Sequence, residues 1–157
     1  MIKDTPEQEF CRATVRHRLK YVESRVRVRY KETDQMGIAH HANYLAWFEI
    51  GRTDLCRVAG FVYTGIEERG YLLVVTDIAC RYRTPFRYDD EVLIRTSLAE
   101  TASRSLKFGY ALYDGEGREL HANGSSSHLW LDKESRRPVR APVDVMAAFE
   151  RWGTVDR

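Results

Sequence analysis

The first regular pattern in the chain is a strict alternation of apolar and charged residues from Arg25 to Tyr30. Val26, Val28 and Tyr30 fall on one face, and three arginines fall on the other. A period of two residues is that of a half-buried β-strand, so we predict a strand here. Residues 1–22 are polar and basic without a clean period, and we interpret them as an N-terminal extension.

The pattern then changes to helical spacing over residues 43–60. Apolar residues recur at offsets of three, seven and four, at Leu45, Phe48, Leu55 and Ala59. Three further apolar residues widen the apolar face of this predicted helix, namely Trp47, Ile50 and Val58. We therefore predict a helix packed deeply against a sheet. It ends at Gly60, because glycine suits the left-handed residue after a helix.

The next part of the chain is rich in β-branched and aromatic residues, which favour strands. Four strands are predicted, over residues 71–84, 91–100, 105–114 and 118–131. Turn-forming residues separate them, and the run from Asp114 to Gly117 is a strong hairpin signal. Antiparallel neighbours are implied at this hairpin.

The order of these elements predicts the fold class. A strand, a long helix and four strands describe an α+β fold, in which an antiparallel five-stranded sheet wraps around one long central helix. A short last helix is predicted from Pro142 to Gly153, because proline favours a helix start and glycine a helix end. We divide the chain into the extension at 1–22, one domain at 23–135 and a C-terminal tail at 136–157 that carries this helix.

Composition narrows the function classes. At 157 residues the chain has room for one domain. Its 25 basic and 23 acidic residues give a formal charge of +2, which is too small for the positive field that non-specific nucleic-acid binding needs. A local basic cluster is interpreted as a solvated face, and it consists of Arg12, Arg16, Arg18 and Lys20.

The cysteines and the hydrophobic runs bear on location. Cys11, Cys56 and Cys80 lie far apart without a Cys-x-x-Cys motif, so we expect free thiols in a reducing compartment, with neither disulfides nor a zinc cluster. The N-terminal segment has no apolar run after its first charges, and no stretch approaches the roughly 20 apolar residues that span a bilayer. We expect a cytoplasmic protein without a membrane span.

Candidate chemistry concentrates in residues 33–44, between the first strand and the helix. In a structural interpretation, Asp34 caps a turn, Gly37 supplies a positive φ and Asn43 caps the helix. In a catalytic interpretation, the helix begins near His41, where unpaired N–H groups and the positive end of the helix dipole can hold a carbonyl oxygen. The His41 N–H would then stabilise charge on that oxygen, while the Asp34 carboxylate activates water or attacks the carbon.

Other acids and histidines near this segment are weaker candidates. We expect Glu32 and Glu49 to make structural pairs, Glu49 with Arg52 three residues on; the alternative is that Glu49 acts as a partner base across a subunit interface. His40 and His41 point about 100° apart at a helix start and have no third ligand at metal-binding spacing, so no metal site is expected. The His41 side chain either orients substrate or water, or only bonds the loop.

A serine or cysteine hydrolase is poorly supported. The chain has no Gly-x-Ser-x-Gly motif, and Cys56 lies in the apolar helix, where a thiol is usually inert. His121 and His128 fall in a predicted strand, and we assign them packing or surface positions.

Residues 26–61 resemble the 4-hydroxybenzoyl-CoA and YbgC-like acyl-CoA thioesterases, a family of hotdog proteins. The stretch reads VRVRYKETDQMGIAHHANYLAWFEIGRTDLCRVAGF, and the resemblance extends over residues 22–135. The residues that carry it are Tyr30, Thr33, Asp34, Gly37, His41, Tyr44, Glu49 and Arg52, followed by Tyr82 and Pro85 in a later strand pattern. A hotdog sheet around a central helix is implied.

The resemblance also implies an activity, that of an acyl-CoA thioesterase without a cofactor. Asp34 is implied as nucleophile or general base, and His41 as a residue that lines the site and polarises the thioester carbonyl through its backbone N–H. A homo-oligomer is implied as well, in which two subunits pair edge to edge with active sites at their interface. A dimer of dimers is a common assembly in such proteins.

The substrate-binding candidates are Gly37, Tyr44, Trp47, Phe48, Glu49 and Arg104. The three aromatic residues would line a pocket for an aromatic or medium-length acyl group. In the family that the chain resembles, coenzyme A enters near the turn between the third and fourth strands, where this chain has only Arg104 and then Lys107. This leaves an acyl carrier protein open as the thioester carrier.

Two rival functions stay open at this point. One is an acyl-CoA hydratase, whose usual motif is not visible in the chain. The other is a non-catalytic hotdog protein that binds acyl-CoA or acyl carrier protein, such as a transcriptional sensor. The extension of about 20 residues is too short for a three-helix DNA-binding domain, which disfavours the sensor.

Overall fold

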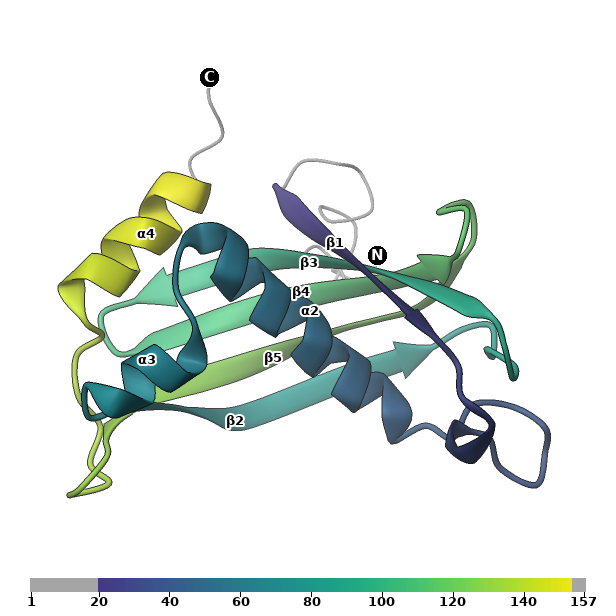
Figure 1. The fold of residues 1–157 in the computed structure, drawn as a ribbon, viewed down its shortest axis with the longest axis horizontal. Helices are drawn as coiled ribbons and strands as arrows, with labels where there is room; N and C mark the ends of the chain where they lie inside the picture. The colour runs from purple at the N-terminus through teal and green to yellow at the C-terminus, as the bar shows by residue number, and fades with distance from the viewer. Residues whose placement is uncertain (1–19, 154–157) are drawn as a thin grey trace, which may run out of the picture.

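The computed structural model describes residues 20–153, which form a five-stranded antiparallel sheet with helices against it (Figure 1). The strands are β1 (Tyr21–Arg27), β2 (Tyr71–Tyr82), β3 (Glu91–Ala102), β4 (Ser105–Asp114) and β5 (Leu120–Asp132). They are ordered β1-β3-β4-β5-β2. The helices are α2 (Asn43–Ala59), α3 (Tyr63–Glu68) and α4 (Val143–Gly153), and a 3-10 turn, η1, spans Tyr30–Glu32. The predicted α+β class and the antiparallel sheet are confirmed. Cys11 and nearly all of the basic cluster lie outside the described residues.

The first strand differs from its prediction at both ends. β1 begins at Tyr21, inside the segment that we interpreted as an extension, and it pairs with β3 as far as Arg27. Val28 is buried as predicted, but Tyr30 is 78% exposed. The predicted position of Tyr30 on the buried face is wrong, because the chain leaves the sheet after Arg27 and turns into η1.

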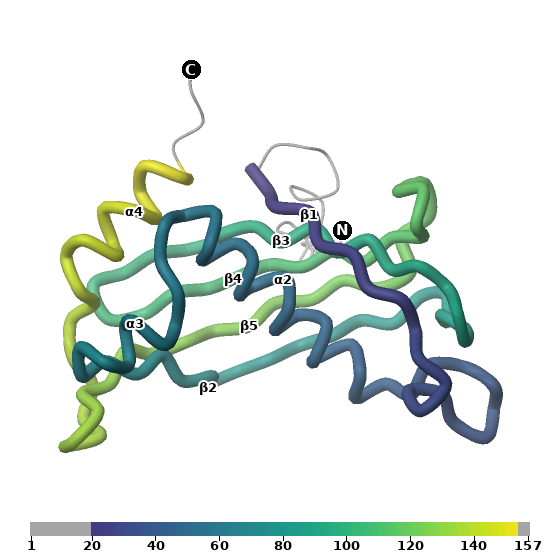
Figure 2. Tube along the Cα trace, viewed as in Figure 1, coloured from purple at the N-terminus to yellow at the C-terminus, as the bar shows by residue number. Residues whose placement is uncertain are grey.

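Helix α2 crosses one face of the sheet and packs on β1, β3 and β4 (Figures 1 and 2). It ends where predicted, at Gly60, which adopts a left-handed conformation with φ of 110°. Its buried residues are Tyr44, Trp47, Phe48, Gly51, Leu55 and Cys56. Ile50 is 39% exposed and Val58 is 60% exposed, so the wide buried surface predicted for this helix is wrong at these two positions. The sheet contacts the opposite side of the helix.

Two glycines set how closely α2 approaches the sheet. A Cβ atom on Gly51 would overlap Thr96 Oγ1 on β3, and one on Gly124 would overlap the Ala79 carbonyl oxygen. The Phe48 ring fills the space beside Gly124 and stacks on Tyr110, with ring centroids 4.2 Å apart. Small residues on both surfaces therefore let one aromatic ring occupy the middle of the helix-sheet contact.

The predicted helix near the C-terminus is confirmed as α4. Its residues Val145, Phe149 and Trp152 join the core, and Phe149 packs edge-on against Phe61 at 4.9 Å. The predicted hairpin is also present, since the Gly117 N–H donates to the Asp114 carbonyl over 2.8 Å. Helix α3 was not predicted from the sequence.

Candidate active site

The loop between η1 and α2 holds Asp34 in a tight turn. The Asp34 N–H donates to the Ile38 carbonyl (2.9 Å), and the Gly37 N–H donates back to the Asp34 carbonyl (3.0 Å). Gly37 has a φ of 76°, which glycine tolerates best. Asp34 Oδ1 accepts the Met36 N–H over 2.8 Å. These observations confirm the turn-capping role predicted for Asp34 and the positive φ predicted for Gly37. Within residues 20–153 the other carboxylate oxygen of Asp34 makes no hydrogen bond.

Backbone and side-chain bonds fasten this loop to the rest of the domain. The Ala39 N–H donates to the Phe86 carbonyl and the His40 N–H donates to the Glu32 carbonyl, both over 2.8 Å. The Asn43 amide donates to the same Glu32 carbonyl (2.8 Å). Asn43 does not cap the helix as predicted, because it is the first helical residue and its side chain turns back to the loop.

His41 lies two residues before the first residue of α2, so the helix begins near His41 as predicted. In the described part of the chain its backbone N–H has no acceptor, while its carbonyl accepts the Tyr82 hydroxyl over 3.0 Å. The exposed His41 ring lies on the His40 ring, with centroids 4.1 Å apart. An unpaired donor close to the positive end of a helix is suited to hold a substrate oxygen. No hydrogen bond joins Asp34 to His41 among residues 20–153.

The three aromatic candidates of α2 are core residues. Tyr44, Trp47 and Phe48 are at most 2% exposed. The Phe86 N–H points to the Tyr44 hydroxyl (3.4 Å), and burial raises the pKa of Tyr44. Contact between these three side chains and an acyl group stays a prediction.

The two acidic candidates, Glu32 and Glu49, differ in their burial and in their partners. Glu32 is buried and accepts hydrogen bonds from the Arg29 side chain (2.7 Å) and backbone (2.8 Å), which confirms its structural role. Burial alone would raise the pKa of Glu32, but the bonds from Arg29 outweigh burial and lower it. Glu49 is exposed and makes no ion pair with Arg52 in the described chain; Arg52 instead points to the Tyr110 hydroxyl at 3.5 Å. The predicted pair is therefore wrong.

Cys56, His121 and His128 are buried, and Cys80 is half-buried. Burial raises the pKa of Cys56 to about 11 and that of Cys80 to about 11, so both thiols stay protonated near neutral pH. His121 stacks on Phe86 at 4.1 Å, and His128 bonds the Ser126 hydroxyl at 2.7 Å. Their predicted packing roles are confirmed.

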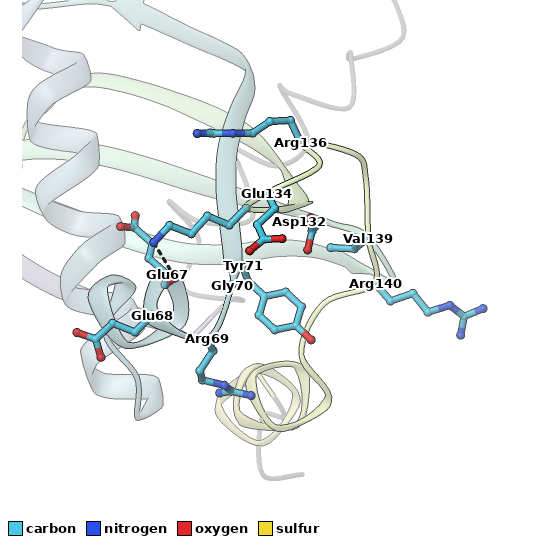
Figure 3. Close-up of a pocket in the computed structure, with 11 residues that line it drawn as sticks. Glu67, Glu68, Arg69, Gly70, Tyr71, Asp132, Glu134, Arg136, Val139 and Arg140 are labelled. Carbon is cyan, nitrogen blue, oxygen red and sulfur yellow. Dashed lines mark hydrogen bonds between the residues drawn. The ribbon is translucent and has the colours of Figure 1, made fainter.

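Arg104, the last substrate candidate, is exposed in the turn between β3 and β4. The segment after β5 lies against this turn, because the Ala141 N–H donates to the Ser103 carbonyl over 2.9 Å. Next to that segment is a surface cavity of about 750 Å³, between the end of α3, the start of β2 and the residues after β5 (Figure 3). Its lining carries both charges, with four basic residues, Arg69, Lys133, Arg136 and Arg140, and four acidic ones, Glu67, Glu68, Asp132 and Glu134.

Residues 20–153 have neither a metal-binding cluster nor a helix that could cross a membrane. They hold no group of three or more His, Cys, Asp or Glu side chains placed to bind a metal ion. None of their helices combines the length and the hydropathy that crossing a membrane requires.

Comparison with known proteins covers most of the chain. The thioesterase-like superfamily matches residues 28–149. The chain is 40% identical over 129 residues to the putative acyl-CoA thioesterase YneP of Bacillus subtilis, covering 82% of this chain and 90% of that protein. It is 30% identical over 125 residues to acyl-CoA thioesterase YbgC of Haemophilus influenzae, covering 79% and 90% respectively. Among solved structures, DHNA-CoA thioesterase from Staphylococcus aureus matches with a TM-score of 0.80 at 28% identity, covering 83% of this chain and 89% of that chain.

Proposed function

The chain belongs to the thioesterase-like superfamily, and from this premise we propose that it hydrolyses an acyl-CoA thioester to a free acid and coenzyme A. The names of its relatives support a thioester hydrolase. The observation that carries the proposal is the His41 backbone N–H, which has no acceptor among residues 20–153 and lies just before α2. A donor fixed in this way can stabilise the oxyanion of an acyl-transfer reaction.

The proposed reaction adds water across the C–S bond. The carbonyl oxygen of the substrate accepts the His41 N–H and gains negative charge as the carbon is attacked. In the general-base route, Asp34 takes a proton from water while the water oxygen bonds to the carbonyl carbon; the C–S bond then breaks and the thiolate takes that proton. In the nucleophilic route, an Asp34 oxygen bonds to the carbon first and the thiolate leaves; water then hydrolyses the mixed anhydride, which frees the Asp34 carboxylate and the acid, and the proton released goes to the thiolate. Either route needs the carboxylate oxygen that is not bonded to Met36.

The test is release of free thiol from a panel of acyl-CoA and acyl carrier protein thioesters by the wild type and Asp34→Asn. Asparagine keeps an oxygen for the Met36 N–H and so preserves the turn, but it is neither a base nor a nucleophile. We expect the turnover number to fall about 1,000-fold or more.

The matched control for this test is Asp90→Asn. The Asp90 carboxylate also caps a turn, by accepting the Arg87 N–H over 2.7 Å, and this variant should keep its activity. Full activity of Asp34→Asn would remove Asp34 from the mechanism. Absence of thiol release from every substrate would reject hydrolysis and leave the hydratase or the binding protein.

We also propose that α2 is the central helix of a hotdog subunit and that two subunits pair along β2. This strand lies at one edge of the sheet, where Val75 and Tyr82 are 49% and 48% exposed. The unpaired N–H and carbonyl groups of an edge strand can bond to a second copy. Light scattering tests this assembly, and a monomer at working concentration would contradict it. The dimer of dimers and the cytoplasmic location stay predictions.

Coenzyme A is the carrier that we propose, with its phosphates near the β3–β4 turn. Arg104 supports this, and Arg140 adds a second cation, because its neighbour Ala141 bonds to Ser103 in that turn (Figure 3). Faster turnover of acyl carrier protein thioesters than of acyl-CoA in the same panel would contradict it.

A further inference from the structure

Tyr82 connects the edge strand β2 to the candidate active site. It is the last residue of β2, and its hydroxyl donates to the His41 carbonyl over 3.0 Å. Its ring packs edge-on against the His41 ring at 6.5 Å and against Tyr44 at 4.9 Å. We propose that Tyr82 is a positioning residue, which fixes the His41 peptide so that its N–H points at the substrate carbonyl. This inference rests on the proposed function.

The loop needs such a fixing contact because His41 lies outside the helix. On its N-terminal side, the His40 carbonyl, which shares a peptide unit with the His41 N–H, accepts the Asn43 N–H over 3.0 Å. On its C-terminal side, the hydrogen bond from Tyr82 is the one that His41 makes with another residue in the described chain. The two bonds hold the peptide units on either side of the His41 α-carbon. Because the His41 N–H lies in the first of these planar units, the two bonds limit its direction.

The chemistry of Tyr82 suits this role. Burial and the neighbouring Cys80 raise the pKa of Tyr82 to about 12, so the hydroxyl stays a neutral donor throughout the physiological range. A neutral donor orients the His41 carbonyl without adding a charge beside the developing oxyanion. Two aromatic contacts hold the Tyr82 ring, so removal of the hydroxyl alone leaves the packing in place.

The experiment compares Tyr82→Phe with the wild type in steady-state hydrolysis of the best acyl-CoA substrate. A small misplacement of a catalytic group can cost up to about 100-fold in rate, and we expect kcat to fall about tenfold with KM within about twofold. The melting temperature should stay within about 2 °C of the wild type, since the ring remains. Tyr88→Phe is the matched control: Tyr88 lies on the adjoining loop, its ring contacts Tyr30, and its loss of a hydroxyl should change none of these values.

Hydrogen exchange distinguishes a positioning role of Tyr82 from a general loss of protein stability. Hydrogen exchange of the peptide that covers residues 39–45 should become faster in Tyr82→Phe and stay unchanged in Tyr88→Phe. Unchanged kcat and unchanged exchange in Tyr82→Phe would overturn the proposal, as would a fall in kcat that comes with a raised KM and a lower melting temperature. If Asp34→Asn is inactive while Tyr82→Phe is fully active, the proposed function stands and the positioning role fails. If the wild type releases no thiol from any substrate, the proposed function itself fails.

Discussion

The middle of α2 and the loop before its first residue differ in how completely their atoms are partnered. In the middle, Phe48 is fully buried against Tyr110, and Gly51 leaves no room for a methyl group above Thr96. In the loop, His41 has a backbone donor without an acceptor in the described chain. The comparison indicates that the middle of α2 supplies stability, and we propose that the loop before it supplies chemistry. Substitutions should therefore separate the free energy of unfolding from the rate of hydrolysis.

The largest effect on stability should come from Phe48→Ala. Removal of a fully buried phenylalanine from a core costs about 3–5 kcal/mol, because the transfer free energy is lost and a cavity remains. Urea unfolding measures this loss. The KM of the same variant tests whether Phe48 also contacts substrate. An unchanged KM for the folded fraction would mean that Phe48 is only a core residue. A raised KM would mean that the substrate site extends to the middle of the helix.

The next effect is a pH dependence that involves His128. Tyr110, Ser126 and His128 form a buried chain of hydrogen bonds, of 2.6 Å and 2.7 Å. Burial lowers the pKa of His128 from 6.5 to about 4, so between these values the unfolded chain takes up a proton that the folded protein refuses. The stability from this group is complete above pH 6.5 and is lost as the pH falls towards 4.

We expect this loss to reach about 3 kcal/mol at most. His128→Gln should remove it, which urea unfolding at several pH values would show as a smaller fall in stability than in the wild type. An identical fall in both proteins would assign the acid sensitivity to other groups.

The smallest effect concerns the closeness of α2 to the sheet. Gly51→Ala places a methyl group onto Thr96 and Ile94 and should cost about 1–3 kcal/mol, despite the better helix propensity of alanine. Gly65→Ala in α3 is the matched control, because its added methyl group meets only Val62 at 3.8 Å, and it should stabilise by about 0.5–1 kcal/mol. Thermal unfolding of both variants checks the sign. A stabilised Gly51→Ala would mean that the helix and sheet yield more easily than their packing suggests.

Local patterns predicted most of the fold. The alternation and the turn residues located β2, β3, β4 and β5, because strands with one buried face repeat every two residues. The same rule placed Tyr30 wrongly, since an apolar residue beyond a strand end continues the pattern in the sequence but not in space. Helix α3 escaped prediction because its six residues are too few to show a helical period.

The candidate site was predictable only where its parts are close in the sequence. The turn of Asp34 and Gly37 follows from residue types within four positions. The hydrogen bond between Tyr82 and His41 joins residues 41 positions apart. The residues next to either one do not indicate that the fold brings them together. The mistaken pairing of Glu49 with Arg52 has the same origin: spacing along the helix favours it, but Tyr110 on β4 offers Arg52 another partner.

The hydrogen bond between the Asp34 carboxylate and the Met36 N–H has a consequence for the entropy of catalysis. A free aspartate rotates about its side-chain bonds, and a substrate that needs one orientation must immobilise that rotation when it binds. Here the turn has already selected an orientation during folding. The loss of rotational freedom is then a cost to the stability of the loop. In the proposed mechanism, the substrate therefore meets a carboxylate whose orientation is already fixed.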